Sequence, residues 1–545
     1  MKQLKRFTLI SSIVLLLVIT FNGCYPISTG AVKWRIKWDK DLKAGREDYL
    51  ESLVTNPVKD DRPNIIILLA DDLGKYEVGA YGSTTVKTPN IDELAKDGCQ
   101  FSDGYVSAPV CAPSRAGIIT GRYQTRFGFE TQEMEFYPAN MIEYLSGRYL
   151  VNIGDWVVST KPRYPREWQI AKQGVPPTEI ELGEVMKKMG YTTGVIGKWH
   201  LGSNPKYQTP LKRGFDYSYG CLGAFTLYGP SADTKGLVNF RSNSFSTKYQ
   251  WDMGRSENGA IVENGRTIKK EEGYLTDHIA ENTISFIKRN KDKPFFLYVP
   301  FTAPHEPFQA KEADYNNNKG KTKDEGKAVY WGIIDALDKA VGDIHKTVKE
   351  LGLEKNTIIY FLSDNGPASY TGIPDCGPLK GGKLTQFEGG INVPFIMKWK
   401  GKIKPGTKFD YPVISLDIFS TSVAAAKGTL PTDRKIDGVN LLPYINGEQK
   451  GRPHEMLYWK ADHINVIRKG DYKLILSTRD NWIELYNLKT DKGETKDLSK
   501  EMPEKVKELS VDFYNWRTTL PKKPMWPRIM DHKFNIRGKD YLFPA

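Results

Sequence analysis

The chain has 545 residues, of which 39% are hydrophobic and 12% aromatic. This apolar content excludes a disordered chain and is enough for a large core, so we expect one large domain with a smaller one. The 78 lysines and arginines outnumber the 65 acidic residues, and the formal charge of +13 favours polyanionic partners. A well-solvated surface would carry such a surplus equally well, and this alternative stays open.

The first 23 residues have the features of a targeting segment. A basic start is followed by an apolar run over residues 7–21, which is shorter than the roughly 20 residues that a membrane-spanning helix needs. Gly23 directly before Cys24 resembles a bacterial lipoprotein cleavage site, which predicts a signal peptide over 1–23 and a lipid anchor on Cys24. Ordinary cleavage is the alternative. Either way, we expect an exported protein, in the periplasm or anchored to the outer membrane.

Strands and helices are expected to alternate through the next part of the chain. Thr88 and Pro89 supply a cap and a first-turn proline for one helix, and Thr178 with Glu181 predicts a capping box for another. A polar loop is expected at 316–326. Apolar runs predict strands at 64–70, 192–196, 295–299 and 358–362, and amphipathic spacing predicts helices at 88–98, 182–189 and 330–348.

This order predicts an α/β fold with a large, doubly wound and mostly parallel sheet. Beyond about residue 430, short strands at 472–476 and 483–488 and a helix at 504–516 predict a smaller antiparallel α+β domain. We therefore expect an N-terminal extension over 24–60, a main domain over 61–430 and the smaller domain over 431–545. The aromatic and basic stretches 130–176 and 219–272 lack a regular pattern, and we interpret them as substrate loops.

Polar residues follow four of the predicted strands, at the edge of the sheet where ligands of open α/β sheets bind. Each is weak evidence alone, because an aspartate pair is also a common turn or helix cap and a lone histidine is often structural. Together, three carboxylates and an amide form an all-oxygen site suited to Ca²⁺. The residues are Asp71 and Asp72, Lys198 and His200, His305, and Asp364 and Asn365.

The most specific segment runs from Cys111 to Arg122, with the sequence CAPSRAGIITGR. It resembles the signature of the type I sulfatases of the alkaline-phosphatase superfamily, C-x-P-S-R followed by T-G-R, in which the cysteine is converted to formylglycine. The alternative is a buried cysteine before a helix. The resemblance extends from residue 63 to about 500, through blocks at 190–202, 381–394 and 484–498. It implies that the main domain is the catalytic domain of a sulfuric ester hydrolase.

The resemblance also implies a role for each site residue. Arg115 would hold the formylglycine, and His200 would lie beside its hydroxyls. A formylglycine-generating or anaerobic sulfatase-maturating enzyme is an implied partner. The expected sulfate contacts are Lys198, His305 and Lys383. The expected ligands of one Ca²⁺, with Mg²⁺ as the alternative ion, are Asp71, Asp72, Cys111, Asp364 and Asn365.

Two other functions stay open from the sequence. One is a phosphonate or phosphate ester hydrolase of the same superfamily, and the other is a non-catalytic glycan-binding protein at the cell surface. For a sulfatase, the basic charge and the long aromatic stretches favour a sulfated polysaccharide or its oligosaccharides, such as algal glycans or glycosaminoglycans, over a small aryl sulfate. No nucleic acid partner is expected.

The five cysteines form no disulfide framework in a chain of this length. If Cys24 is lipidated and Cys111 is modified, at most one disulfide can join two of Cys99, Cys221 and Cys376. The alternative is that these three are small buried residues.

Overall fold

The computed structural model describes residues 36–53, 61–133, 144–150, 153–158, 167–242, 250–251, 254–269, 271–528 and 530–545. The predicted signal peptide and Cys24 lie outside the described residues. Within the described ranges, no helix is both long enough and apolar enough to cross a membrane.

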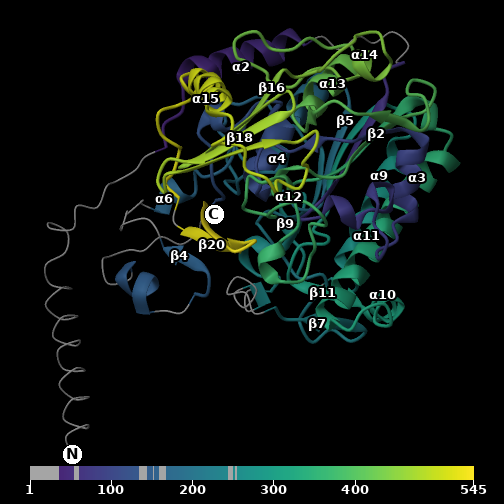
Figure 1. The fold of residues 1–545 in the computed structure, drawn as a ribbon. Coiled ribbons are helices and arrows are strands. Elements are labelled where there is room, and N and C mark those ends of the chain that lie inside the picture. Colours follow the sequence, from purple (N-terminus) through teal and green to yellow (C-terminus); the bar gives the residue numbers. More distant parts are fainter. Residues whose placement is uncertain are drawn as a thin grey trace, which may run out of the picture.

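A ten-stranded mixed sheet forms the centre of the larger domain (Figure 1). Five neighbouring strands in its middle are parallel, as a doubly wound fold requires. Antiparallel pairs then flank this parallel centre on both sides. In order across the sheet, the strands are β14 (Thr407–Phe409), β2 (Cys99–Phe101), β13 (Phe395–Trp399), β12 (Thr357–Ser363), β1 (Asn64–Ala70), β10 (Phe295–Pro300), β5 (Thr192–Ile196), β6 (Tyr217–Cys221), β8 (Ile261–Glu263) and β9 (Arg266–Thr267).

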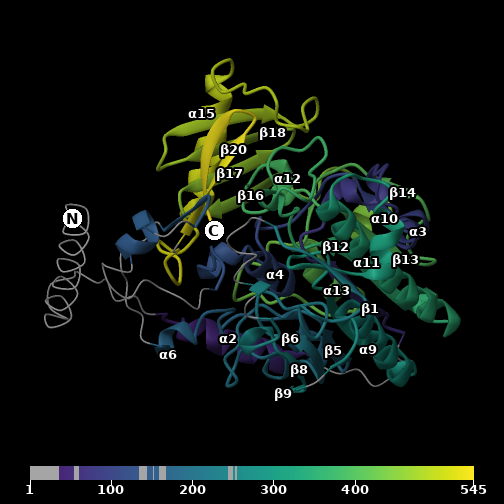
Figure 2. The same cartoon turned by 90° about the horizontal axis from the view of Figure 1, so that it is seen from below.

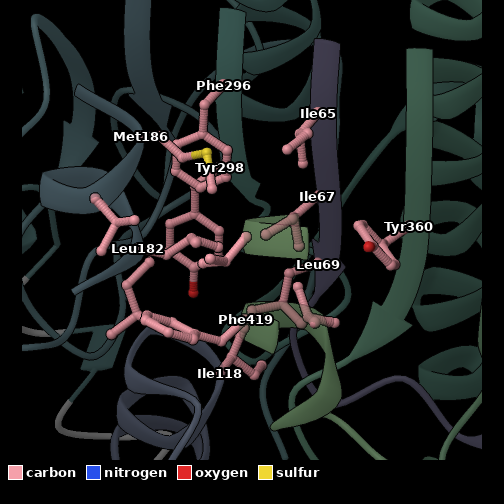
Figure 3. Close-up of a cluster of buried hydrophobic side chains, with 14 of the residues drawn as sticks. Ile65, Ile67, Leu69, Ile118, Leu182, Met186, Phe296, Tyr298, Tyr360 and Phe419 are labelled. Carbon is pink, nitrogen blue, oxygen red and sulfur yellow. The ribbon is translucent and has the colours of Figure 1, made fainter. Parts of the chain in front are cut away.

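Helices cover both faces of this sheet, and β1 is therefore buried at every position. Ile65, Ile67 and Leu69 face one helical layer, and Figure 3 shows Leu69 near Phe419, with Ile67 and Ile65 successively further along the strand. The alternate residues of β1 face the other layer. Each fully buried Ile or Leu stabilises the fold by roughly 1.5–3 kcal/mol. The first layer contains α4 (Cys111–Thr120), α7 (Leu182–Lys188) and α13 (Asp417–Ala425), and the second contains α3 (Pro89–Asp97), α9 (Leu275–Asn290) and α11 (Glu325–Glu350).

A separate antiparallel sheet forms the C-terminal part of the chain (Figure 2). Leu474 and Leu485 of this sheet share a core with Phe513 of α15 (Pro503–Arg517). The same core contains Leu384 and Ile391, so the sheet packs directly on the segment that carries Lys383. The sheet contains β16 (Met456–Ala461), β17 (Ile464–Lys469), β18 (Tyr472–Ser477) and β19 (Trp482–Asn487).

A third sheet joins the end of the chain to the first predicted substrate loop. The hairpin of β20 (Met530–Ile536) and β21 (Lys539–Pro544) pairs through β20 with β4 (Trp156–Val158). The predicted loops therefore do contain short elements. The second loop likewise contains β7 (Leu237–Phe240), β8 and β9.

Two predicted helix caps were wrong in detail. Helix α7 begins after Glu181, and its capping box is formed by Glu181 and Glu184 instead of Thr178. Thr88 does precede α3, with Pro89 in the first turn, but its side chain makes no capping bond. Its hydroxyl donates to Asp92 instead (3.0 Å).

The polar loop predicted at 316–326 is shorter than expected. Helix α10 (Glu312–Asn318) covers its beginning, and α11 begins at Glu325. Asp324 caps α11 by accepting a hydrogen bond from the Lys327 amide (3.1 Å), a capping signal within the polar stretch. The four described cysteines are all free thiols, and three of them are buried.

Candidate active site

The ends of neighbouring parallel strands bring the predicted polar residues to one edge of the sheet. Backbone hydrogen bonds continue beyond the strands: the Asp71 amide donates to the Ala303 carbonyl (3.0 Å) and the Lys198 amide to the Pro300 carbonyl (2.7 Å). These bonds fix the backbone from which the side chains project. All seven residues predicted at the strand ends are buried.

Cys111 is the first residue of α4 and lies against the aspartates that follow β1. Its Sγ is 3.3 Å from Asp71 Oδ1 and 3.8 Å from Asp72 Oδ1. Burial and the nearby Asp364 and Asp71 raise the pKa of the Cys111 thiol well above its usual value. An unmodified cysteine here is therefore a neutral thiol, which is a weak nucleophile.

Arg115 lies one turn after Cys111 on α4 and is completely buried. Its Nε donates to Asp364 Oδ2 (2.8 Å), and its Nη1 donates to the Lys198 carbonyl (2.7 Å). Burial would lower the pKa of Arg115, but Asp364 and Asp71 outweigh it, and the net shift is upward. Arg115 therefore stays charged and connects the start of α4 to the segments that follow β5 and β12.

Three cationic or protonatable groups face the two aspartates. Lys198 Nζ is 2.6 Å from Asp71 Oδ2, and Lys383 Nζ is 2.8 Å from Asp72 Oδ2. His305 Nε2 lies 3.6 Å from the same Asp72 oxygen. The predicted sulfate contacts thus converge on one carboxylate pair, although Lys383 is distant from that pair in sequence.

His200 lies within this group of charges and is itself buried. Burial and the positive charges of Lys198 and Arg115 lower the pKa of His200 well below its usual value, so this imidazole is neutral. Its Nδ1 has no hydrogen-bond partner among the described residues. Asp72 and His200 both have left-handed backbones, with φ of 65° and 53°. Such strain is commonly held at functional sites by the surrounding structure.

The carboxylates of the site differ in their affinity for protons. Burial would raise the pKa of Asp71, but Lys198, His305 and Arg115 hold it far below its usual range. For Asp364, burial and the charge of Asp71 raise the pKa to about 7 in spite of Arg115. Asp364 is therefore the carboxylate of the two that takes up a proton more readily.

The donor set fits a divalent cation. Asn365 Oδ1 is buried and has no hydrogen-bond partner in the described part of the chain, while Asn365 Nδ2 lies 2.7 Å from Asp72 Oδ1. A buried, unpaired oxygen beside carboxylates suits a hard cation. Asp364 is directed toward Arg115 and the Asp72 amide (3.2 Å). Ligand atoms within 4.8 Å of one another are offered by Asp71, Asp72, Cys111 and His305.

This cluster of acidic, cysteine and histidine side chains overlaps with the predicted metal ligands. It contains three of the five predicted residues and adds His305, which was predicted to contact the sulfate. Asp364 and Asn365 lie alongside, each in contact with Asp72.

The sequence did not reveal what holds the Lys383 segment in place. Lys473 of β18 is completely buried and lies 2.9 Å from Glu388 Oε1 and 2.9 Å from Glu494 Oε1. Glu388 begins α12 (Glu388–Ile391), shortly after Lys383. The sequence contained one sign of this contact, a lysine within an otherwise apolar strand. Because the ammonium group of such a lysine usually reaches solvent, the sign was not sufficient to predict a buried ion pair.

Comparison with known proteins establishes the family. The family model named Sulfatase matches residues 63–429, about two thirds of the chain. The chain belongs to the type I sulfatase family. A second model, N-sulphoglucosamine sulphohydrolase, C-terminal, matches residues 382–517 of this sulfatase.

Relatives of this sulfatase include curated enzymes and solved structures. It is 33% identical to the N-acetylgalactosamine-6-sulfatase of Homo sapiens over 418 residues, which cover 75% of this chain and 71% of the relative. The steryl-sulfatase of Homo sapiens is 30% identical over 466 residues, covering 75% of this chain and 74% of the relative. The crystal structure of Ps i-CgsB is similar with a TM-score of 0.69 at 31% identity, covering 85% of this chain and 94% of that chain.

A second structure of Ps i-CgsB, in complex with k-i-k-neocarrahexaose, matches at 30% identity with the same TM-score of 0.69 and the same coverage. The protein is accordingly a sulfuric ester hydrolase, which confirms the enzyme class predicted from the sequence. The predicted α/β fold with a separate antiparallel C-terminal sheet is confirmed.

Proposed function

We propose that this sulfatase removes sulfate from a sulfated carbohydrate through a formylglycine made from Cys111, with one Ca²⁺ at the site. The observation that carries the proposal is the position of Cys111, whose Sγ lies 3.3 Å from Asp71 at a strand edge lined with buried cationic groups. A plain serine there would form a covalent sulfate ester and a plain cysteine an S-sulfocysteine, and neither has a fast route to hydrolysis. A hydrated aldehyde at this position has a second hydroxyl, whose deprotonation can release the bound sulfate.

The buried charges match the needs of sulfate ester cleavage. A bound Ca²⁺ would offset the charges of Asp71 and Asp72 and make a coordinated hydroxyl easier to deprotonate. The hydrated aldehyde would supply one hydroxyl to attack sulfur and a second whose deprotonation releases sulfate. Lys198 and Lys383 are suited to stabilise the negative charge on the equatorial sulfate oxygens, because they are already buried and oriented.

Two histidines are assigned to proton transfer. His305 donates from Nδ1 to the Glu306 carbonyl, so its imidazolium form, which also carries a proton on Nε2, gives that Nε2 proton to the departing alcohol, helped by Lys383. His200 takes the proton of the second hydroxyl, and its buried Nδ1 without a hydrogen-bond partner among the described residues supports this role. Arg115 keeps the start of α4 in place through Asp364.

The substrate class is supported by the relatives. One relative is an N-acetylgalactosamine-6-sulfatase, and a structural neighbour was solved with a neocarrahexaose. We therefore propose a sulfated oligosaccharide or polysaccharide of the algal or glycosaminoglycan type. A desulfation screen on defined sulfated oligosaccharides, read by mass, identifies the sugar. Activity on small aryl sulfates with none on any sulfated sugar would overturn this assignment.

The Cys111→Ala variant tests the nucleophile. We expect it to release no sulfate and to lose the reaction with an aldehyde-specific hydrazide that the mature wild-type protein gives. Cys99→Ala is the matched control, because Cys99 is a buried free thiol in β2. Equal sulfate release from the Cys111→Ala variant and the wild type would refute the mechanism.

Removal of the metal tests the cation site. Dialysis against a chelator should abolish activity and lower the thermal unfolding midpoint, and Ca²⁺ should restore both better than Mg²⁺. At a free ion concentration of 100 times Kd, the expected gain in unfolding free energy is about 2.7 kcal/mol. An unchanged midpoint in the presence of either ion, with full activity after chelation, would contradict the proposal.

We also propose export of the protein and maturation of Cys111 by a formylglycine-generating or anaerobic sulfatase-maturating enzyme. The support for export is the basic start, the apolar run 7–21 and Cys24 in the sequence. Mass spectrometry of the mature N-terminus distinguishes a lipidated Cys24 from ordinary cleavage, and an intact Met1 in the mature protein would contradict both.

A further inference from the structure

Three aromatic side chains from distant parts of the chain lie together beside the active site. We call Trp156, Tyr370 and His532 the aromatic wall. Trp156 in β4 is the Cα partner of His532 in β20, and their ring centroids are 4.8 Å apart. The Tyr370 ring lies 6.0 Å from Trp156 and 5.3 Å from His532. Figure 1 shows the yellow β20 beside the blue β4, below the C-terminal sheet.

Tyr370 connects the aromatic wall to the catalytic residues. Its hydroxyl donates to Glu306 Oε1 (3.1 Å), and Glu306 directly follows His305. The turn before Tyr370 is bonded to the other side of the site, because the Lys383 amide donates to the Pro367 carbonyl (2.8 Å). Burial and Glu306 raise the pKa of Tyr370, and Lys383 opposes this effect, so the hydroxyl lies within the field of that lysine.

Polar groups accompany these rings. Gln250 Nε2 donates to the same Glu306 oxygen (3.4 Å). Gln250 Oε1 is buried and has no hydrogen-bond partner within the described ranges. Trp156 belongs to the stretch 130–176 and Gln250 to 219–272, so both stretches interpreted as substrate loops reach the surroundings of Glu306.

Aromatic rings beside hydrogen-bond acceptors are what a pyranose ring requires, since its C–H face packs on aromatic surface and its hydroxyls donate hydrogen bonds. Trp156 and Tyr370 are partly exposed, so their rings are accessible to a ligand. We propose that the aromatic wall, with Glu306 and Gln250, forms the subsite for the sugar ring that carries the sulfate. This inference rests on the proposed function and deepens it by assigning the residues that recognise the carbohydrate.

The test separates sugar binding from sulfate binding. In the Trp156→Ala and His532→Ala variants, KM for the neocarrahexaose or for N-acetylgalactosamine 6-sulfate, whichever the wild type desulfates, should rise by about 5- to 10-fold. The inhibition constant of inorganic sulfate, which probes the catalytic residues alone, should change by less than about 2-fold. Trp156→Phe, which keeps an aromatic ring, should recover most of the affinity.

Tyr149→Ala is the matched control, because Tyr149 lies in the same stretch as Trp156 and is 69% exposed. It should leave both constants unchanged. An unchanged KM in both wall variants would overturn the subsite, and so would an equal rise of KM and of the sulfate inhibition constant, which indicates a disturbed active site. If the wild type releases no sulfate from any ester, the proposed function itself fails. Sulfate release with an unchanged KM refutes the subsite alone.

Discussion

Lys473 offers the sharpest test of how the C-terminal sheet supports the active site. Its ammonium group is completely buried between Glu388 and Glu494, at 2.9 Å from each. Glu494 Oε2 also accepts the Glu388 amide hydrogen bond (2.7 Å) at the start of α12. One lysine therefore holds two carboxylates, and with them the end of the segment that carries Lys383.

The Lys473→Met variant removes the charge and keeps most of the side-chain volume. Loss of one partner from a buried ion pair costs about 3–5 kcal/mol, because an uncompensated charge is left behind. Domains are stable by only about 5–15 kcal/mol, so such a loss should lower the unfolding midpoint strongly. Sulfate release should also fall, since Lys383 loses its fixed backbone.

Urea unfolding of the wild type and the variant, followed by far-ultraviolet circular dichroism, measures this effect. Lys489→Met is the control, because Lys489 is exposed and near in sequence, and its change should stay within about 0.5 kcal/mol. Adding Glu494→Gln to Lys473→Met should recover part of the loss, because one unpaired charge is removed. A Lys473→Met protein within about 1 kcal/mol of the wild type would refute the reasoning.

Two further predictions concern the backbone and pH. Gly197→Ala should destabilise by about 3 kcal/mol or more and abolish activity, since φ is +133° and a Cβ would lie 1.9 Å from the Pro300 carbonyl oxygen. Gly352→Ala, with φ of +72° but open space around it, should lower the unfolding free energy by only about 1 kcal/mol. Thermal unfolding of both variants measures the difference. Equal midpoints for these two variants would contradict this. Burial would lower the pKa of His454, but Asp417 at 2.8 Å raises it overall. The ion pair should therefore stabilise fully below about pH 6.5, and this contribution should be lost as the pH rises through the raised pKa. The difference in Tm between the wild type and His454→Gln should shrink from about pH 6 to about pH 9, and a constant difference would rule the pair out.

The parallel centre of the sheet could be predicted because strands buried on both faces are continuous apolar runs. The strand predicted at 295–299 is one residue shorter than β10 at its end, and the strand predicted at 358–362 is one residue shorter than β12 at each end. The strands β8, β9 and β14, at or next to the edges of the sheet, have only two or three residues and no long apolar run, so no local sequence pattern predicted them. Helix α7 begins at Leu182, directly after its N-cap Glu181, because Glu184 completes the capping box. The sequence pattern at Thr178 predicts a different pairing.

The sequence by itself determined the family, through the segment beginning at Cys111, and the edge at which Asp71, Lys198 and Asp364 gather. It could do so because parallel strands end on the same side, so local strand order already fixes which residues meet. Only the tertiary structure decided that Lys473 sits between Glu388 and Glu494 and that Trp156 pairs with His532. These contacts join segments far apart in the chain, and their register depends on how separate sheets pack, which no local periodicity encodes.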